Sequence, residues 1–227
     1  MKILFISDTH ANYPALKALD PYIDNVDVTI CLGDIVGYYC DINEVIDYLK
    51  EKKVICILGN HDRYLIEGLE KQTKLLNSSV RFGIEIAKQT ISKENLRWLN
   101  SLPISLGLIY DQCSILCCHG SPYDPISEYV FDNNNLASVI EKHKYNIIAL
   151  GHTHREFVRK INDTIILNPG SVGQARDHKN FVCAKILDTE SMNIETLLLE
   201  YDYKSTINKA EDYGADQWVY RHFNFIE

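Results

Sequence analysis

The stretch ILFISDTH, at residues 3–10, decides the fold of this chain. Its first four residues are apolar and predict a buried strand, and Asp8 and His10 follow where that strand ends. The same arrangement returns in VTICLGD at residues 28–34 and in VICILGNHD at residues 54–62. Longer segments with the apolar spacing of helices lie between these runs. This alternation predicts strand–helix–strand units and a largely parallel sheet.

The spacing of the polar residues in these runs matches one strand–helix–strand unit. Asp8 and Asp34 are 26 residues apart, and Asn60 lies 26 residues after Asp34. One such unit takes roughly 30 residues, so the three side chains should arrive at the carboxyl ends of neighbouring parallel strands. Open α/β sheets bind their ligands at that edge. We therefore expect a functional site there.

The second half of the chain is rich in strand patterns. We expect strands at residues 104–109, 114–118, 147–150, 156–160, 164–167, 181–187 and 194–199. Helices are expected at residues 62–100, where Ser92 is a candidate N-cap, and at residues 134–142. So many strands predict two sheets packed face to face with helices outside them. We expect one α/β domain over residues 1–227.

Local signals mark three further helices. Pro14 is well placed as the first residue of a helix, and Asp41 with Glu44 resembles a capping box. The C-terminal segment, residues 205–227, should begin as a helix up to Gly214 and continue as an aromatic tail of Trp218, Tyr220, Phe223 and Phe225. Such a tail could stack on a substrate base or form a dimer seam. We expect it to dock onto the core instead.

The composition argues against several kinds of partner. The 227 residues carry a formal charge of −8, and no block of lysine or arginine suits a long nucleic acid or an anionic membrane. A small phosphate-containing substrate stays compatible, because bound dications make a site locally positive. No apolar run reaches the roughly 20 residues of a membrane span, and the first run is too short for a signal peptide. We expect a cytoplasmic protein; a homo-oligomer is left open.

The cysteines carry no metal-site or disulfide pattern. Seven are present, none in C-x-x-C spacing, and most lie in apolar, strand-like runs. Free cysteine packs as a small hydrophobic residue, so we expect reduced thiols in the core. The odd number fits a reducing compartment.

Five short motifs supply side chains that bind metals well. They are Asp8-Thr9-His10, Gly33-Asp34, Gly59-Asn60-His61-Asp62, His119-Gly120 and Gly151-His152-Thr153-His154. Carboxylate and amide oxygens combined with imidazoles are the ligands of two-metal hydrolytic centres. Positions i and i+2 at a strand end share a face, so the first aspartate and histidine can converge on one ion. The sequence has no paired cysteines, no G-x-S-x-G and no phosphate-binding P-loop.

The motif at residues 59–62 is the most specific of the five. Asn60 can give its carbonyl oxygen to a metal without adding negative charge. His61 can stand beside the site as a proton donor, because imidazole titrates near neutrality. Asp62 could orient that imidazole or cap the helix that follows.

Taken together, the five motifs resemble those of the calcineurin-like metallophosphoesterase superfamily, over residues 8–154. The strings GDIVGY at 33–38, HGSP at 119–122 and NPGSVG at 168–173 are similar to its small prokaryotic phosphoesterase branch. The resemblance implies a four-layer α/β/β/α sandwich with two mixed β-sheets flanked by helices. That architecture agrees with the number of expected strands.

The resemblance also implies a ligand set and a mechanism. One metal would be held by Asp8, His10, Asp34 and His154, and the other by Asp34, Asn60, His119 and His152. A hydroxide bridging two divalent transition-metal ions would attack phosphorus in line, and His61 would protonate or stabilise the leaving oxygen. Manganese is expected, while iron, zinc, cobalt and nickel also suit these ligands.

The chain departs from the protein phosphatases of this superfamily. Those enzymes carry arginines in G-D-x-V-D-R-G and R-G-N-H-E, where this chain has Tyr38 or Tyr39, and Leu58. Such arginines clamp a dianionic phosphomonoester, so their loss favours a phosphodiester or a nucleotide phosphoanhydride. Arg155 and Arg176 are candidates for holding a substrate phosphate, although surface ion pairs are their expected role.

Several other functions stay open at this point. A diadenosine-polyphosphate hydrolase differs only in substrate, and a phosphomonoesterase or protein phosphatase is less favoured for the reason just given. A non-catalytic binding scaffold on the same fold, as in the related retromer subunit, would be expected to lose His61 or several ligands. None is missing here, so we expect a metal-dependent, phosphodiesterase-like hydrolase.

Overall fold

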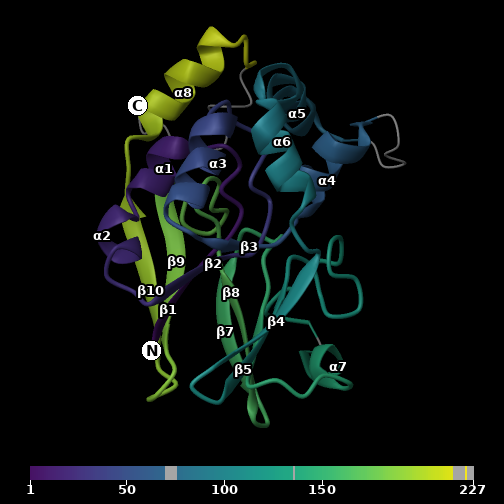
Figure 1. Cartoon of the computed structure of the whole chain (residues 1–227), viewed down its shortest axis with the longest axis vertical. Helices are drawn as coiled ribbons and strands as arrows, with labels where there is room; N and C mark the ends of the chain where they lie inside the picture. The colour runs from purple at the N-terminus through teal and green to yellow at the C-terminus, as the bar shows by residue number, and fades with distance from the viewer. Residues whose placement is uncertain (70–75, 135, 217–222, 224–227) are drawn as a thin grey trace.

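Two five-stranded sheets form the centre of the molecule (Figure 1). The structure is a computed structural model that describes residues 1–69, 76–134, 136–216 and 223. The first sheet contains β1 (Lys2–Ile6), β2 (Val28–Cys31), β3 (Ile55–Cys56), β9 (Phe181–Asp188) and β10 (Ile194–Glu200), in the order β10-β9-β1-β2-β3. Its strands β1, β2 and β3 are parallel, whereas β9 and β10 join as antiparallel neighbours.

The second sheet is also mixed. It contains β4 (Ser105–Tyr110), β5 (Cys113–Cys118), β6 (Ile147–Ala149), β7 (Glu156–Ile161) and β8 (Thr164–Pro169), in the order β4-β5-β6-β8-β7. Strands β5, β6 and β8 are parallel, and β4 and β7 are antiparallel to their neighbours at the two edges. The two parallel sets direct the carboxyl ends of their strands toward the loops that carry the five motifs.

Helices cover the outer face of each sheet. Within the described ranges, six helices each pack one or more buried side chains over the first sheet. They are α1 (Tyr13–Lys17), α2 (Asp20–Ile23), α3 (Ile42–Glu51), α5 (Ser78–Thr90), α6 (Lys93–Asn100) and α8 (Tyr203–Asp212). Partly buried side chains of α4 (Asn60–Glu67) pack against the same cluster. The second sheet is covered by α7 (Leu136–Ile140) and nearby loops. The expected sandwich of two mixed sheets flanked by helices is therefore confirmed.

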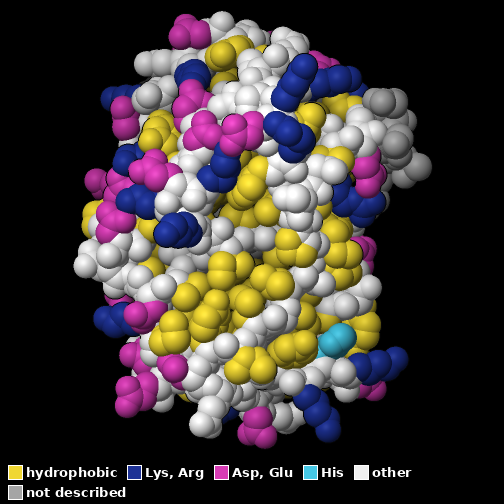
Figure 2. Space-filling view, viewed as in Figure 1, with side chains coloured by type: hydrophobic (Ala, Val, Ile, Leu, Met, Phe, Trp, Pro, Cys, Tyr) yellow, Lys and Arg dark blue, Asp and Glu magenta, His cyan; other side chains and the backbone are white. Residues whose placement is uncertain are grey.

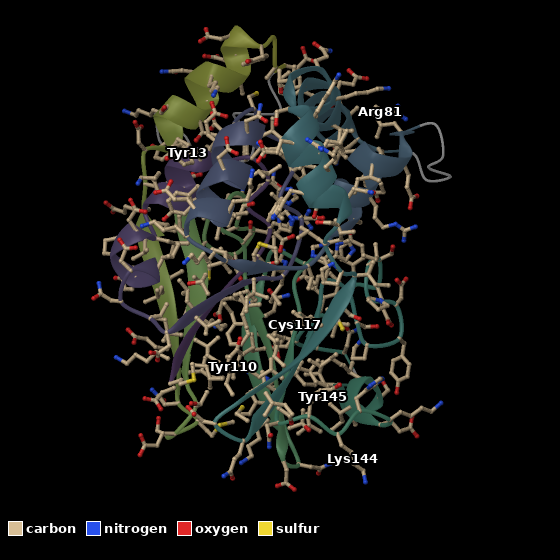
Figure 3. All side chains as sticks on the ribbon, viewed as in Figure 1. Tyr13, Arg81, Tyr110, Cys117, Lys144 and Tyr145 are labelled. Carbon is tan, nitrogen blue, oxygen red and sulfur yellow. The ribbon has the colours of Figure 1, made fainter. Side chains whose placement is uncertain are left out.

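The alternation of side chains in β1 explains why the sheets pack in layers. Ile3 and Phe5 lie between the two sheets, while Leu4 and Ile6 face the helices, and all four are fully buried. A strand buried on both faces reads as a continuous apolar run, as residues 3–6 do. Cys117, labelled in Figure 3, belongs to the layer between the sheets. All seven cysteines are free and buried, as expected.

The central helical region is divided more finely than the sequence suggested. Residues 62–100 hold most of α4, and all of α5 and α6, and α4 already begins at Asn60. The expected N-cap at Ser92 is confirmed, because its hydroxyl accepts from the Asn95 amide at 3.0 Å. The strand in the apolar run that starts at residue 54 is short, because only Ile55 and Cys56 pair with β2 in regular register. The amide of Leu58 donates instead to the Pro103 carbonyl at 2.8 Å, which leads the chain away from the sheet.

The capping box expected at Asp41 is wrong. Asp41 does precede α3, but its side chain makes no capping hydrogen bond. Its carboxylate pairs with Lys209 of α8, and Glu44 contacts the same ammonium at 3.1 Å. A tertiary ion pair has replaced the local contact. The helix expected near Pro14 is present, but it begins one residue earlier, at Tyr13, because the Asn12 side chain caps it.

The C-terminal segment packs on the helical side of the molecule. Helix α8 begins at Tyr203, two residues before the expected start, because Asp202 supplies the N-cap. Phe223 is only 2% exposed and stacks on Tyr203, with ring centroids 5.5 Å apart. This contact agrees with docking onto the core. Trp218, Tyr220 and Phe225 lie outside the described residues.

One face of the molecule is apolar near the edge strand β4. Figure 2 shows hydrophobic side chains gathered over the region where β4 and β5 lie in Figure 1, with charged groups mostly around its margin. Ile109 is 75% exposed there.

The helix expected at residues 134–142 is shorter in the structure, where it is α7 (Leu136–Ile140). Among the described residues, the helices are too short or too polar to span a bilayer.

An ion pair between a fully buried lysine and a partly buried glutamate joins the two sheets close to the functional loops. Lys185 of β9 is fully buried, pairs with Glu156 of β7 and donates to the Thr196 hydroxyl at 2.7 Å. Glu156→Gln should lower the free energy of unfolding by about 3 kcal/mol, because it leaves the ammonium buried without its counter-charge. Urea unfolding at pH 7 measures this loss.

The exposed pair between Arg159 and Asp132, at 2.6 Å, provides the matched control. Asp132→Asn should cost less than about 1 kcal/mol, because solvent screens that pair. Equal losses for the two variants would contradict the assigned role of the buried pair.

Candidate metal centre

The strands of both sheets end in loops that turn sharply toward one another. Asp8, His10, Asp34, His152 and His154 all have positive φ angles, between 48° and 66°. Residues other than glycine rarely adopt this conformation, at a cost on the order of 1 kcal/mol or more each. Such strain persists only where surrounding contacts hold the backbone. The strained backbone therefore indicates that these loops are held in a conformation that directs their side chains.

The first group of side chains contains four candidate ligands. Asp8, His10, Asp34 and His154 bring ligand atoms within 4.8 Å of one another. The Nε2 atom of His154 lies 3.3 Å from an Asp8 oxygen, and the Nε2 atom of His10 lies 3.8 Å from Asp34 Oδ2. All four side chains are buried. This is the set expected for one metal ion.

The second group shares Asp34 with the first. Asp34, His119 and His152 also bring ligand atoms within 4.8 Å of one another. The Nε2 atom of His119 lies 3.3 Å from Asp34 Oδ2 and 3.1 Å from the amide oxygen of Asn60. The structure thus places all seven expected ligands around one carboxylate, in two adjoining groups.

Backbone carbonyls fix the direction of three imidazoles. Nδ1 of His10 donates to the Val36 carbonyl at 2.9 Å, and Nδ1 of His154 donates to the Gln174 carbonyl at 2.7 Å. His119 donates in the same way to the Leu32 carbonyl at 2.7 Å. A carbonyl can only accept, so each Nδ1 carries a proton and each Nε2 is turned toward the centre, where the neutral form of the ring offers its lone pair. Metal-binding histidines commonly have this support.

The packing of these lone pairs fits a bound cation. The Nε2 atoms of His10 and His154 are only 3.0 Å apart, although both would be acceptors in the neutral form. Asp8 Oδ1 and His152 Nε2 are buried without a hydrogen-bond partner within the described structure. Buried acceptors that face one another without donors are costly unless a positive charge lies among them. The donor set of carboxylate, amide and imidazole suits divalent transition metals.

The two carboxylates are ionised despite full burial. Burial favours their neutral acids, but His154 holds the pKa of Asp8 below its usual range, and His119 does the same for Asp34. Burial opposes protonation of His119 as well, yet Asp34 and Asp8 together raise its pKa to about 10. The centre therefore concentrates negative charge that a dication can neutralise.

Three other histidines stay neutral near pH 7. Burial lowers the pKa of His61 to about 4 and that of His152 to about 3. It also holds the pKa of His10 well below its usual value, with neighbouring imidazoles adding to the effect. Neutral imidazole is the form that binds metals.

Asp62 supports the centre through the backbone. Its Oδ2 accepts from the Gly59 amide at 2.8 Å, which caps α4, and its Oδ1 accepts from the amides of Ile35 and Val36 at 2.9 and 3.0 Å. It is fully buried. Of the two roles left open by the sequence, the cap is the one observed. The same carboxylate also joins the loop after Asp34 to the start of α4.

His61 is held by packing. Tyr38 stacks on its ring, with centroids 5.1 Å apart, and a methyl group added to Gly37 would overlap its Nδ1 atom. Its Nε2 atom lies 3.9 Å from Asp34 Oδ2. The imidazole therefore presents Nε2 toward the centre, where a proton donor to a bound phosphate ester is needed.

The NPGSVG string also positions ligand loops. The Asn168 amide donates to the Gly151 carbonyl at 2.6 Å and to the Thr153 hydroxyl at 3.1 Å. The Ser171 hydroxyl donates to the Asp8 carbonyl at 2.8 Å. The string thus binds backbone on both sides of the centre.

A cavity of about 530 Å³ opens beside the two groups. Besides five of the expected site residues, its walls include Tyr38, Arg63, Tyr64, Glu67, Leu76, Asn77, Val80, Ile126, Ser127, Tyr129 and Arg176. Arg176 is exposed, hydrogen-bonds Tyr38 and, in the described part of the chain, pairs with no carboxylate. The ion pair expected for Arg176 is thus not observed within the described residues. Arg155 is also exposed but does not line this cavity.

No motif or spacing in the sequence predicts the aromatic walls of the cavity. Tyr129 stacks on His152, with ring centroids 3.8 Å apart, and Tyr64 lies 5.5 Å from His61. Single tyrosines in a loop or a helix carry no chemical pattern, so only the fold brings them to the centre.

The comparison with known families agrees with this geometry. The profile of the calcineurin-like phosphoesterase superfamily domain matches residues 1–192. The chain therefore belongs to the calcineurin-like phosphoesterase superfamily.

Similar proteins are found in Methanocaldococcus jannaschii and Sphaerobacter thermophilus. An uncharacterised protein of Methanocaldococcus jannaschii is 32% identical over 236 residues, covering 96% of this chain and 95% of that protein. A phosphodiesterase of the same archaeon is 24% identical, covering 88% of this chain and 100% of that protein. The crystal structure of a metallophosphoesterase from Sphaerobacter thermophilus is 27% identical, with a TM-score of 0.83 and coverage of 98% and 97%.

The Asp62 contacts lead to a prediction about metal affinity. Asp62→Asn should weaken Mn²⁺ binding about 10- to 100-fold, because the amide cannot accept all three backbone N–H groups and the loop after Asp34 loses its anchor. Isothermal titration calorimetry with Mn²⁺ measures the affinity. The control is Asp188→Asn, because the Asp188 carboxylate accepts from the amides of Glu190 and Ser191, at the end of β9 far from the centre. Unchanged affinity in Asp62→Asn would contradict the positioning role.

Proposed function

We propose that this chain is a dinuclear metal-dependent phosphoesterase that hydrolyses a phosphodiester or a nucleotide phosphoanhydride. The observation that carries the proposal is Asp34, one buried carboxylate that belongs to both groups of candidate ligands. In this proposal Asp8, His10, Asp34 and His154 hold one ion, and Asp34, Asn60, His119 and His152 hold the other. Superfamily membership and the phosphodiesterase relative support a hydrolase of this kind.

The charges around the cavity favour a diester over a phosphomonoester. Two arginines line the cavity, and Arg63 is already neutralised by Glu67 at 2.7 Å. Arg176 is left to meet the substrate. Leu58 is buried in the core, so no side chain reaches the cavity from the position of a clamping arginine. Among the described residues, one lining cation is thus left without an ion pair, and this suits the single charge of a diester better than the two charges of a monoester.

In the proposed reaction, Arg176 and His61 have separate roles beside the metal ions. Two bound ions would supply Lewis-acid stabilisation of the phosphate and a nucleophile from water at neutral pH. Arg176 orients the phosphate group by a charge-assisted hydrogen bond. His61 holds a proton at Nε2 for the oxygen of the leaving group, and Tyr38 and Gly37 keep its ring in place.

The remaining parts of the proposal concern metal and location. Mn²⁺ is the proposed ion, and the same ligands suit iron, zinc, cobalt and nickel. Seven buried free thiols fit a reducing compartment, which supports a cytoplasmic location. The proposed partner is a small phosphate-containing substrate.

The role of His61 can be separated from metal binding by leaving-group chemistry. For a dinucleotide phosphodiester, His61→Ala should lower kcat about 10²- to 10⁴-fold, because the alkoxide leaving group needs a proton. For bis-p-nitrophenyl phosphate the loss should be smaller, because p-nitrophenolate leaves without one. Steady-state assays with Mn²⁺, combined with calorimetric metal titration, measure both quantities.

Asn60→Ala provides the matched comparison, since it should weaken Mn²⁺ binding and slow both substrates alike. Equal losses on the two substrates for His61→Ala would refute the proton-donor role. Wild-type protein that binds no Mn²⁺ and hydrolyses neither diesters nor nucleotides would refute the proposed function itself.

A further inference from the structure

The cavity is larger than a phosphate group requires. Its volume of about 530 Å³ lies in the range that encloses a whole organic ligand. Beyond the candidate ligands, one wall comes from α4 and the start of α5, with Tyr64, Leu76 and Val80. Val80 is only 5% exposed, and Tyr64 and Leu76 are partly buried. Tyr64, Leu76 and Val80 thus form the aromatic and aliphatic part of a wall that also contains Arg63, Glu67 and Asn77.

The position of His61 decides which part of a substrate this wall would meet. His61 and Tyr64 are three residues apart on α4, so their side chains share one face of the helix, and their ring centroids are 5.5 Å apart. A group whose oxygen reaches His61 Nε2 would therefore extend along Tyr64. The organic group beside Tyr64 is the one that leaves.

The charge of the wall restricts this leaving group further. Arg63 and Glu67 lie on the same helix and neutralise one another, with contacts of 2.9 and 2.7 Å. A leaving group with additional phosphates would find no free cation on α4 and would meet the Glu67 carboxylate. An uncharged, flat group can stack on the tyrosine instead, as bases stack on aromatic side chains.

Building on the proposed function, we propose that Tyr64, Leu76 and Val80 form a leaving-group subsite for a nucleoside. The substrate class is a phosphodiester in which a nucleoside hydroxyl is displaced from phosphorus, and a nucleoside polyphosphate is not the preferred leaving group. In the reaction, water adds its oxygen to phosphorus and the bond between phosphorus and the nucleoside oxygen breaks. That oxygen takes the proton at His61 Nε2, and the proton that the attacking water gives up restores the neutral imidazole. Tyr64 is thus a specificity-determining residue.

A mixed diester, the methyl ester of adenosine 5′-phosphate, tests this directly. Its two leaving groups are alkoxides of comparable basicity, so the site and not the intrinsic chemistry selects the bond. With Mn²⁺-loaded protein, we expect adenosine and methyl phosphate to exceed adenosine 5′-phosphate and methanol by at least about fivefold, the low end of what base stacking supplies. Chromatography of the products measures the ratio within one reaction, independently of the fraction of active protein.

Three variants locate the effect. Tyr64→Leu should bring the ratio close to one, while Tyr64→Phe, which keeps the ring, should preserve it. Tyr123→Leu is the control, because Tyr123 is 49% exposed and does not line the cavity, and it should change neither ratio nor rate.

The outcomes separate the two proposals. Three results would overturn the subsite if the protein still hydrolyses bis-p-nitrophenyl phosphate: equal amounts of the two product pairs, an excess of adenosine 5′-phosphate, or no cleavage of the mixed diester. Each of them would leave the proposed phosphoesterase function intact. A ratio unaffected by Tyr64→Leu would overturn it too. Loss of all diester hydrolysis would count against the proposed function.

Discussion

The structure depends on one buried carboxylate that faces two groups of ligands. Asp34 Oδ2 lies within 4 Å of imidazole nitrogens from His10, His61 and His119, which come from three different segments of the chain. Its Oδ1 accepts from the amide of His61 at 2.8 Å, so the carboxylate is also fixed to the start of α4. Because burial without cations would be unfavourable for this cluster, the surrounding framework must hold it in place. The two sheets and their connecting loops form this framework.

The two sheets supply the rigidity that the loops lack. Parallel strands end at a common edge, and the fully buried layers above and below β1 resist displacement of that edge. The left-handed residues at the strand ends are locally unfavourable, and they persist because backbone contacts join one loop to the next. The Asp8 amide bonds to Gly33, and the His10 amide bonds to Asp34, each at 3.0 Å. Stability in the core thus offsets strain at the centre.

The features that could be predicted are those that depend on local sequence patterns. Apolar runs and the 26-residue spacing placed Asp8, Asp34 and Asn60 at neighbouring strand ends, and the motif residues do lie together. The boundaries of helices and strands were less accurate where tertiary contacts competed. Asp41 pairs with Lys209, which lies 168 residues away, instead of capping α3. Tyr64 and Tyr129 could not be recognised, because an isolated tyrosine has no periodicity or spacing that distinguishes a cavity wall from a surface.

The central claim is that Asp34 lies between two metal ions. Anomalous X-ray diffraction from crystals of the protein loaded with Mn²⁺ tests it most directly, because the signal locates manganese without assuming any ligand. We expect two anomalous peaks, one beside Asp8, His10 and His154 and the other beside Asn60, His119 and His152, with Asp34 contacting both. A single peak, or peaks that do not share Asp34, would contradict it.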